Sequence, residues 1–479
     1  MRLFTLINPF LKKYLGYLTV FTLFISFLSI STANAQDTVR VSLRQFIQIG
    51  LNHSDQVKAE ESKVNMAKNN IDQAKSMKLL PKFQLTTNHS VVPGVESDSV
   101  LSNGKPLPKS QWYLDPNLKN DWSRWSIYSQ VQIQGIQPIF TWGALNNAVK
   151  AATKGAEAAR DQFLSEKSKL ALKLYQLYYS RVLTNQLLRL LGNAQKEFDK
   201  ADRKIKKMQQ SNDSSLDEAD VYKFKIYKSQ FEIKADEVKQ NDNFIKKVWD
   251  LVLGTDSSKV YLPKQQFLDP VDSTVKSYSY YQSLALTNRP ELKALKAAKS
   301  AAKFGLKAKK AQMLPTLFLG LGGEYVYTPR PTERTPMIGN RFSYLNLAYS
   351  FGIRQNLDFW GMKNDIDKMK IKYNEIKYSR DAAVQGIRLE LLNSYKTAKV
   401  AEVTYKKTGD ALHTSTEWLR QEQINYDLGI GKIKNLLDAV KSNLELEAEY
   451  RKKVYDYDLD MAKLYKASGI PIQNLQKIE

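Results

Sequence analysis

The feature that most limits how this chain can fold is an internal repeat. Trp142-Gly143 recurs as Trp360-Gly361, and Asp220 recurs as Asp438, both at an offset of 218 residues. Two landmarks that keep one spacing in both halves indicate a tandem duplication, in which each half supplies the same elements in the same order. The predicted repeats are residues 36–262 and 263–479.

In each half a Leu-Pro dipeptide marks the end of the first expected helix. Proline disfavours helical geometry in the residue before it, so a helix that reaches such a dipeptide ends there. Two strand-like runs follow each dipeptide, then a long helix beginning near the Trp-Gly pair, then a break and a last helix. The first helices are expected over residues 42–78 and 280–312.

The long helix of the first half is expected to run from Trp142 to about Met208. A continuous helix of that length would span about 100 Å at 1.5 Å per residue, which is too long for a compact globule. Apolar residues recur along it at intervals of three, four and seven, as in a coiled coil, and a second apolar face suits neighbours on both sides. The first face holds Phe163, Leu170, Leu174, Leu177, Leu188 and Leu191, and the second holds Leu172, Val182, Leu183, Leu187 and Leu190.

The strand-like runs alternate between apolar and polar residues. In the first half Ile127, Val131 and Ile133 share one face, and Tyr128 with three glutamines shares the other. Such alternation fits either a half-buried soluble sheet or membrane strands with lipid on one side and water on the other. In the second half the apolar face holds Leu317, Leu319, Leu321, Tyr325 and Tyr327, followed by Leu345, Leu347, Tyr349, Phe351 and Ile353.

Aromatic residues near the ends of these runs favour the membrane interpretation. Trp122, Trp125 and Tyr344 flank the alternating segments, as in the aromatic girdles at membrane interfaces. Two hairpins cannot close a barrel, and an open sheet edge is not tolerated in lipid. A chain of this kind would therefore have to oligomerise.

The N-terminus predicts export. Three basic residues precede an apolar run over residues 15–30, and Ala33-Asn34-Ala35 then offers a cleavage site before Gln36. The run is shorter than the ~20 residues that span a bilayer, so a cleaved signal peptide over residues 1–35 is favoured over a retained anchor. The chain has no cysteine, which excludes disulfides, thiolate metal sites and a lipid anchor on cysteine.

The formal net charge is +23, which could suit nucleic acid, an anionic membrane surface or anionic solutes. Export argues against nucleic acid. The histidines His53, His89 and His413 lie far apart, so we expect no metal site and no cofactor. No phosphate-binding glycine loop and no catalytic triad context is present, and we expect no enzyme.

Several motifs, in this order and repeated in both halves, give the chain a resemblance to the TolC family of outer-membrane efflux proteins. The resemblance covers nearly the whole mature chain. Its motifs are Asn288-Arg289-Pro290-Glu291-Leu292 with its weaker partner Asn52-His53-Ser54-Asp55, Gln137-Pro138-Ile139-Phe140 before Trp142-Gly143, and Tyr426-Asp427-Leu428-Gly429 leading into Leu436-Leu437-Asp438-Ala439.

The resemblance implies a mainly α protein with a small β part. Each protomer would be a tandem repeat of long coiled-coil helices that build a periplasmic α-barrel, with four strands of a shared twelve-stranded transmembrane β-barrel. It further implies a homotrimer in contact with outer-membrane lipid, a periplasmic adaptor (membrane fusion) protein and an inner-membrane RND or ABC pump. The function implied is a passive exit duct for efflux or type I secretion of small molecules, metal ions or proteins.

The resemblance also places a pore constriction at the periplasmic mouth. Asp438 and Asn435, three residues apart, match the family's ring of carboxylates, and Tyr426 matches a tyrosine in the links that close the mouth. Asp217 and Asp220 are the first-half equivalents. A structural alternative for Asp217 is a helix start that Ser214 or Ser215 caps, where a carboxylate in the first turn interacts favourably with the helix dipole.

Two departures from the family pattern put cation selectivity in doubt. Asn435 replaces a carboxylate, and Gly431 stands where the family has an arginine in the closing link. The alternatives from other classes are a periplasmic coiled-coil adaptor or scaffold without membrane insertion, and a surface adhesin. The adaptor does not account for the paired alternating hairpins or for the Trp-Gly recurrence, and the lack of Ser/Thr-rich repeats disfavours the adhesin, so we favour the channel.

Overall fold

The computed structural model of the chain describes residues 37–97, 105, 118–211, 217–254, 259–271, 274–329 and 343–472. The expected cleavage site at Ala35 and Gln36 lies outside the described residues. The chain forms two units, one of Met1–His53 with Leu177–Leu268 and one of Ser54–Gln176 with Asp269–Glu479. The repeat boundary between residues 262 and 263 stays a prediction.

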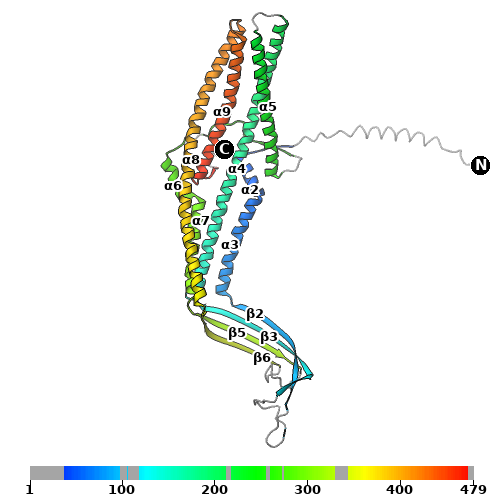
Figure 1. Cartoon of the computed structure of the whole chain (residues 1–479), viewed down its shortest axis with the longest axis vertical. Coiled ribbons are helices and arrows are strands. Elements are labelled where there is room, and N and C mark those ends of the chain that lie inside the picture. Colours follow the sequence, from blue (N-terminus) through cyan, green and yellow to red (C-terminus); the bar gives the residue numbers. More distant parts are fainter. Residues whose placement is uncertain are drawn as a thin grey trace, which may run out of the picture. The chain divides into compact units, whose positions relative to one another are not determined.

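Helices make up most of the described chain (Figure 1). The predicted long helix is confirmed as α4, with 67 residues, and α8 is its second-half counterpart, with 69 residues. The helices are α2 (Leu43–His53), α3 (Asp55–Leu79), α4 (Ala144–Gln210), α5 (Glu218–Leu253), α6 (Tyr278–Asn288), α7 (Pro290–Ala311), α8 (Phe359–Asp427) and α9 (Ile433–Ala467).

The burial pattern of α4 differs in part from the predicted leucine faces. Leu174 and Val182 are buried, but several other leucines of the two predicted faces are only half-buried. Tyr175, Tyr178 and Tyr179 instead supply the largest buried side chains of this stretch. These tyrosines follow the same helical spacing as the leucines, and their aromatic rings form the buried face of the helix that the leucines were predicted to form.

Both of the first predicted helices are broken at one residue, which corrects the expectation of single helices over residues 42–78 and 280–312. The breaks fall at Ser54, which caps α3 by accepting a hydrogen bond from the Val57 amide, and at Arg289, which precedes a proline at the start of α7. The paired motifs at Asn52 and Asn288 are therefore helix breaks, and they occupy the same place in each half.

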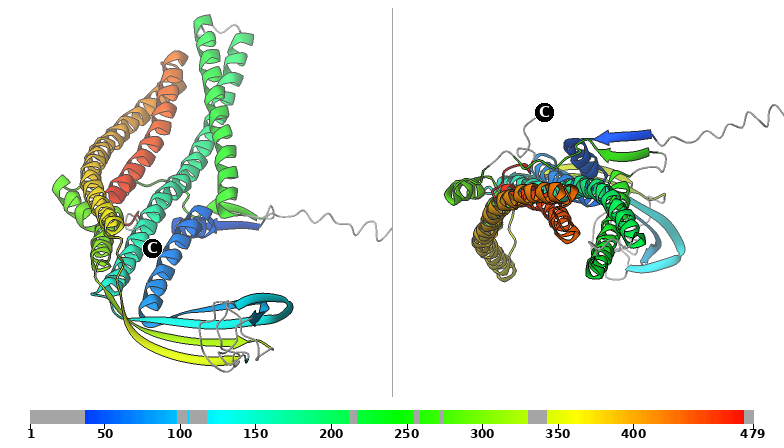
Figure 2. Two further views of the ribbon diagram at one scale, coloured as in Figure 1. Left: turned by 60° about the horizontal axis from the view of Figure 1, so that its bottom comes forward. Right: turned by 90° about the horizontal axis from the view of Figure 1, so that it is seen from above.

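A four-stranded antiparallel sheet follows the predicted order of two hairpins. Its strands lie in the order β2-β3-β5-β6, and both views show them as a long curved layer (Figures 1 and 2). The bounds are β2 (Lys82–Ser97), β3 (Leu118–Phe140), β5 (Thr316–Tyr327) and β6 (Tyr344–Arg354). β2 and β6 form the two edges, so among the described residues each pairs on one side only.

The first hairpin is longer than expected. The prolines and glycines of residues 91–121 predict one long loop between the first two strands, whereas β2 continues to Ser97 and β3 already begins at Leu118. Pro93 and Gly94 do not end the strand because they lie at a shift of register between Val92 and Gly94, where a strand tolerates proline.

A second, small sheet was missed in the sequence. β1 (Asp37–Val41) pairs in parallel with β4 (Lys259–Pro263), and both belong to the first unit. The Tyr178 hydroxyl donates a hydrogen bond to the Val41 carbonyl over 3.1 Å, which ties this ribbon to α4. Five-residue strands far apart in the chain carry no local pattern strong enough to predict their pairing.

Candidate functional site

A tight turn joins α8 to α9 and carries the predicted constriction residues. Gly429 has a left-handed φ of 75°, and the amides of Ile430 and Gly431 both donate to the Asn425 carbonyl, over 3.1 and 2.9 Å. A Cβ on Gly431 would lie 2.8 Å from the Tyr426 backbone nitrogen. Backbone packing therefore requires glycine at 431.

The three second-half residues lie close to this turn. Tyr426 is in the last turn of α8 and is half-buried, whereas Asn435 and Asp438 lie in the first turns of α9, exposed and half-buried respectively. Ile433 and Leu437 on the same helix are buried. The structure thus brings Tyr426, Asn435 and Asp438 to one end of the α8–α9 hairpin, and their role as a constriction stays a prediction.

The first-half equivalents occupy the start of α5 in the other unit. Asp217 is the N-cap of α5, and its carboxylate accepts a hydrogen bond of 3.0 Å from the Ala219 amide. Asp220 lies in the first turn, half-buried. Capping accounts for Asp217, because a carboxylate there satisfies an amide that the helix leaves unpaired. The role of Asp220 in a pore constriction stays a prediction.

A buried ion cluster surrounds the Arg289 motif, which sequence reasoning had used only as a family marker. The Arg289 guanidinium is 4% exposed and binds Glu291 at 3.0 Å and Glu390 at 2.5 Å, while Lys466 binds Glu390 at 2.7 Å. Burial alone would raise the pKa of Glu291, but the hydrogen bonds from Arg289 outweigh burial and lower this pKa to about 2. The cluster joins α7, α8 and α9 at one point.

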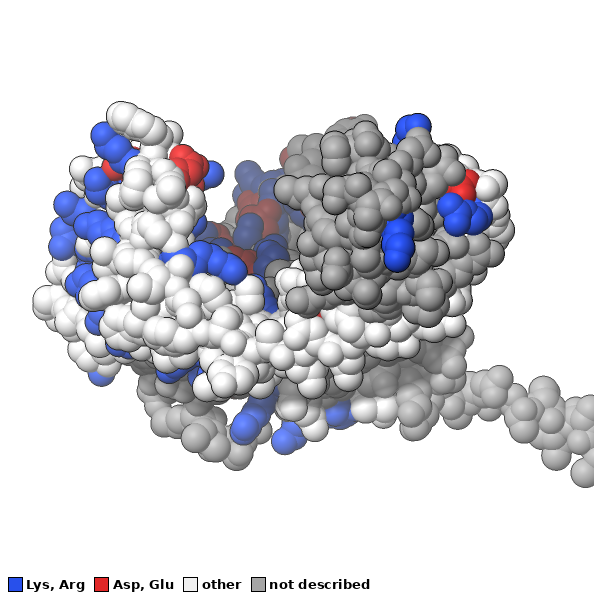
Figure 3. Space-filling view, turned by 90° about the horizontal axis from the view of Figure 1, so that it is seen from below, with Lys and Arg blue, Asp and Glu red and all other residues white. Residues whose placement is uncertain are grey.

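The two faces of the four-stranded sheet differ sharply in polarity, as predicted. Directly paired residues share a face, and the row Leu85, Ile133, Gly323 and Leu347 crosses all four strands on the apolar side. Leu345, Leu347, Tyr349, Phe351 and Ile353 of β6 are 67–86% exposed. Seen from below, uncharged residues form a broad continuous area of the surface (Figure 3).

The opposite face is polar. It carries Gln84, Thr86, Asn88 and Ser90 of β2, Gln130, Gln132 and Gln134 of β3, and Glu324 and Asn346 of the second hairpin. Tyr344 also lies on this face, where its hydroxyl donates to Glu324 over 3.0 Å. Its assignment to an interfacial girdle is therefore corrected, whereas Trp122 and Trp125 are exposed, at 60% and 53%.

Two helices, one in each unit, carry exposed apolar stripes. Residues separated by sums of three and four lie on one helix face, and large apolar residues of α5 and α8 follow that spacing at 53–81% exposure. The stripe of α5 is Tyr222, Ile226, Ile233, Phe244 and Leu251, and the stripe of α8 is Trp360, Ile371, Tyr378, Leu389, Leu392, Val400 and Val403.

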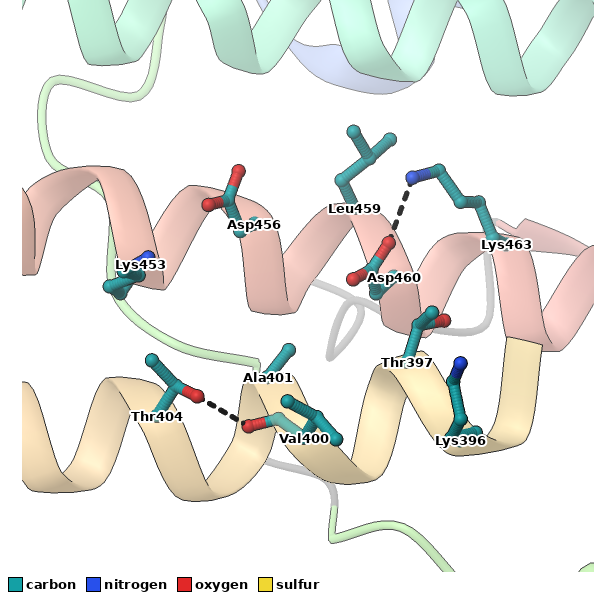
Figure 4. A pocket seen from close by; sticks show the side chains of 10 residues that line it. All are labelled: Lys396, Thr397, Val400, Ala401, Thr404, Lys453, Asp456, Leu459, Asp460 and Lys463. Carbon is teal, nitrogen blue, oxygen red and sulfur yellow. Dashed lines mark hydrogen bonds and ion pairs between the residues drawn. The ribbon is translucent and has the colours of Figure 1, made fainter. Parts of the chain in front are cut away.

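An open groove of about 620 Å³ runs between α8 and α9 within the second unit (Figure 4). Val400 of the α8 stripe lines it, together with lysines and aspartates of both helices. Lys463 pairs with Asp460 at 2.8 Å, and burial raises the pKa of Asp456. The groove is therefore an open part of the exposed surface of α8, and it does not enclose a ligand site.

Within the described residues, no helix is at once long and apolar enough to cross a membrane. In the same part of the chain, no three histidine or acidic side chains gather as a metal site.

Solved structures with this fold are outer-membrane proteins. The Campylobacter jejuni CmeC outer membrane channel matches with a TM-score of 0.68 and 15% identity, over 89% of this chain and 85% of that one. VceC of Vibrio cholerae matches with a TM-score of 0.67 and 16% identity, over 90% and 96%. The open-state MtrE channel of Neisseria gonorrhoeae gives a TM-score of 0.66 and 15% identity, over 90% and 89%.

The chain therefore shares its fold with solved outer-membrane channels and an outer-membrane protein. Residues 282–470 match the model of the outer membrane efflux protein family. This match over the second half of the chain agrees with the TolC resemblance of the sequence. No curated protein sequence matches the chain.

Proposed function

We propose that three copies of this chain form a passive exit duct across the outer membrane for solutes delivered by an inner-membrane pump. The observation that carries the proposal is the sheet, whose apolar face is exposed and whose two edges have no partner strand among the described residues. In lipid every backbone amide and carbonyl needs a partner, so such a sheet has to close on other copies.

The strand directions allow that closure. The four strands alternate in direction through three antiparallel pairings, so the free edges, β2 and β6, run in opposite directions. β6 of one copy can therefore pair antiparallel with β2 of the next. Three copies give twelve strands, with the apolar face toward lipid and the polar face toward a water-filled lumen.

The exposed stripes of α5 and α8 support the same assembly. Large apolar residues gathered on one face of a soluble helix usually mark a contact with another chain. The sheet disfavours the alternative of a periplasmic adaptor or scaffold. In a protein that stays in water, the apolar face of β6 would be exposed to water, which is unfavourable. Burial of both stripes by neighbouring copies would extend the barrel into a helical tunnel.

The match of residues 282–470 to a family whose name describes efflux supports a pump and an adaptor as partners. We propose that the helical end binds a periplasmic adaptor and an inner-membrane RND or ABC pump. Energy would come from the pump, so the duct itself needs no catalytic residue. Small molecules, metal ions or, in type I secretion, proteins are the cargo classes that such a duct can pass.

We further propose that the turn between α8 and α9 narrows the duct. Three-fold symmetry would bring three copies of Asp438 around one axis, with Asn435 three residues away on the same helix. A ring of carboxylates attracts multivalent cations, whereas a ring of neutral amides does not. Asp438 would then form the single effective acidic ring, with Tyr426 beside it at the end of α8.

Single-channel recording of the purified protein in planar bilayers tests both parts. The wild type should conduct without nucleotide or proton gradient, and a trivalent cation added on the helical side should block the current. Asp438→Asn should raise the half-blocking concentration at least about tenfold, since one charge-assisted contact is worth more than 1.4 kcal/mol. Asn435→Asp should lower it by building a second ring.

The possible results distinguish the proposal of a conducting duct from the proposal that Asp438 forms its constriction. Conduction with equal block in wild type and Asp438→Asn would leave the duct standing and make Asp438 a structural residue of α9. Protein that inserts as a trimer but never conducts would contradict the duct itself. The Asp217→Ala variant serves as a control, because loss of a helix cap should cost about 1 kcal/mol of stability without changing the block.

A further inference from the structure

Arg354, the last residue of β6, lies on the polar face of the sheet at its helical end. It is paired with Thr316 across the hairpin, and its guanidinium carbon lies 5.1 Å from the centre of the Phe318 ring. The ring lies close over Gly352, where a Cβ would come within 2.8 Å of the Phe318 Cζ atom. Gly352 thus makes room for an aromatic platform on which the guanidinium stacks.

Lys82, the first residue of β2, lies on the same polar face and at the same helical end. Its register partner is Ile136, two residues along each strand from the pair of Gln84 and Gln134. Lys82 is exposed, and neither Lys82 nor Arg354 has an ion pair within the part of the chain that the structure describes. Two cations without a counter-charge therefore face the interior side of the sheet.

The two cations belong to opposite edges of the sheet. Within one chain β3 and β5 separate β2 from β6, so Lys82 and Arg354 cannot share a ligand there. In the proposed closed barrel β6 of one copy lies beside β2 of the next, which brings Arg354 and the neighbouring Lys82 to one subunit boundary. The site is incomplete without the second copy.

We propose that Arg354 and Phe318 of one copy and Lys82 of the next form an anion-binding site on the inner wall of the barrel, near its helical end. The proposal rests on the trimeric duct proposed above. A guanidinium stacked on a phenyl ring presents its donors to a carboxylate, sulfonate or phosphate, and the ring contacts a flat apolar group beside that anion. The ligand class is therefore anionic aromatic solutes.

The charge of this site differs from that of the polar face farther along the strands. Glu324 is an acidic residue on that face, and it is held by Gln130 and by Tyr344. It lies eight residues along β5 from Thr316, toward the opposite end of the sheet. Anionic solutes would therefore meet cations first and a carboxylate later, which favours transient rather than tight binding.

Block by pyrene tetrasulfonate, added on the helical side in planar bilayers, tests the site. The wild type should be blocked, and Arg354→Gln and Lys82→Gln should each raise the half-blocking concentration about tenfold, the loss expected for one charge-assisted contact. Phe318→Leu should weaken the block by pyrene tetrasulfonate more than the block by inorganic sulfate. Glu324→Gln is the matched control, since it removes a charge of opposite sign and should leave the block intact or strengthen it.

Equal half-blocking concentrations in the wild type, Arg354→Gln and Lys82→Gln would overturn the site while the channels still conduct. Absence of any conduction in the wild type would instead overturn the duct on which the site depends. If Arg354→Gln does not insert, Arg354→Lys keeps the charge but loses the stacked plane, and its half-blocking concentration should lie between those of the wild type and Lys82→Gln.

Discussion

Leu347→Arg is expected to prevent stable insertion of the protein in the outer membrane. Leu347 lies in β6 on the apolar face, is 76% exposed, and pairs with Gly323 of β5. An arginine on the lipid side of a barrel costs about 2–4 kcal/mol near the membrane midplane, and three copies would carry that cost in the trimer. Protease sensitivity of the protein in isolated outer membranes measures the effect.

Asn346→Arg is the matched control, because Asn346 is the preceding residue and lies on the polar face opposite Glu324. An arginine there would face water and a carboxylate, so normal insertion and normal protease resistance are expected. Equal tolerance of the two substitutions would mean that the apolar face does not meet lipid, and the assignment of the two faces would be wrong.

Arg289→Ala is expected to destabilise the helical part by about 3 kcal/mol near neutral pH, as when one partner of a buried ion pair is removed. The substitution leaves Glu291 and Glu390 without the buried guanidinium that binds both. Urea unfolding followed by circular dichroism measures the loss. Lys309→Ala is the control on the same helix, since its ion pair with Asp365 is exposed and should be worth less than about 1 kcal/mol.

The effect of Arg289→Ala should depend on pH in a defined direction. Arg289 lowers the pKa of Glu291 to about 2, against about 4.3 in an unfolded chain. The stabilisation by this carboxylate is therefore fully present above about pH 4.3 and is lost as the pH falls toward 2. The difference between wild type and Arg289→Ala should shrink over that range, and a constant difference would assign the loss to packing alone.

Helices and strands that follow from the local spacing of apolar residues could be predicted from the sequence. Alternation placed Leu345 and Leu347 on one face and Asn346 on the other, and the spacing of apolar residues predicted the 67 residues of α4. The recurring motifs marked the positions of Ser54 and Arg289, but they did not show that a helix breaks there. A helix broken at one residue and a continuous helix have the same spacing of apolar residues.

Long-range contacts explain what the sequence did not show. The partners of Arg289 come from residues 390 and 466, and no periodic signal links positions so far apart. The strands β1 and β4 pair across 222 residues of sequence. At the predicted constriction, Gly431 follows from backbone packing, which residue identities alone do not reveal.

Disulfide trapping between the two edge strands tests the trimeric duct most directly, because the chain has no cysteine of its own. Ala348→Cys on β6 would be combined in turn with Gln84→Cys, Thr86→Cys, Asn88→Cys and Ser90→Cys on β2, all on the polar face. Two strands separate these edges within one chain, about 14 Å at the usual strand spacing, and a disulfide needs Cα atoms within about 7 Å. A covalent trimer in the outer membrane from at least one pair is the expected result. Monomers from all four pairs, in membranes that contain the protein, would contradict closure of the barrel by three copies.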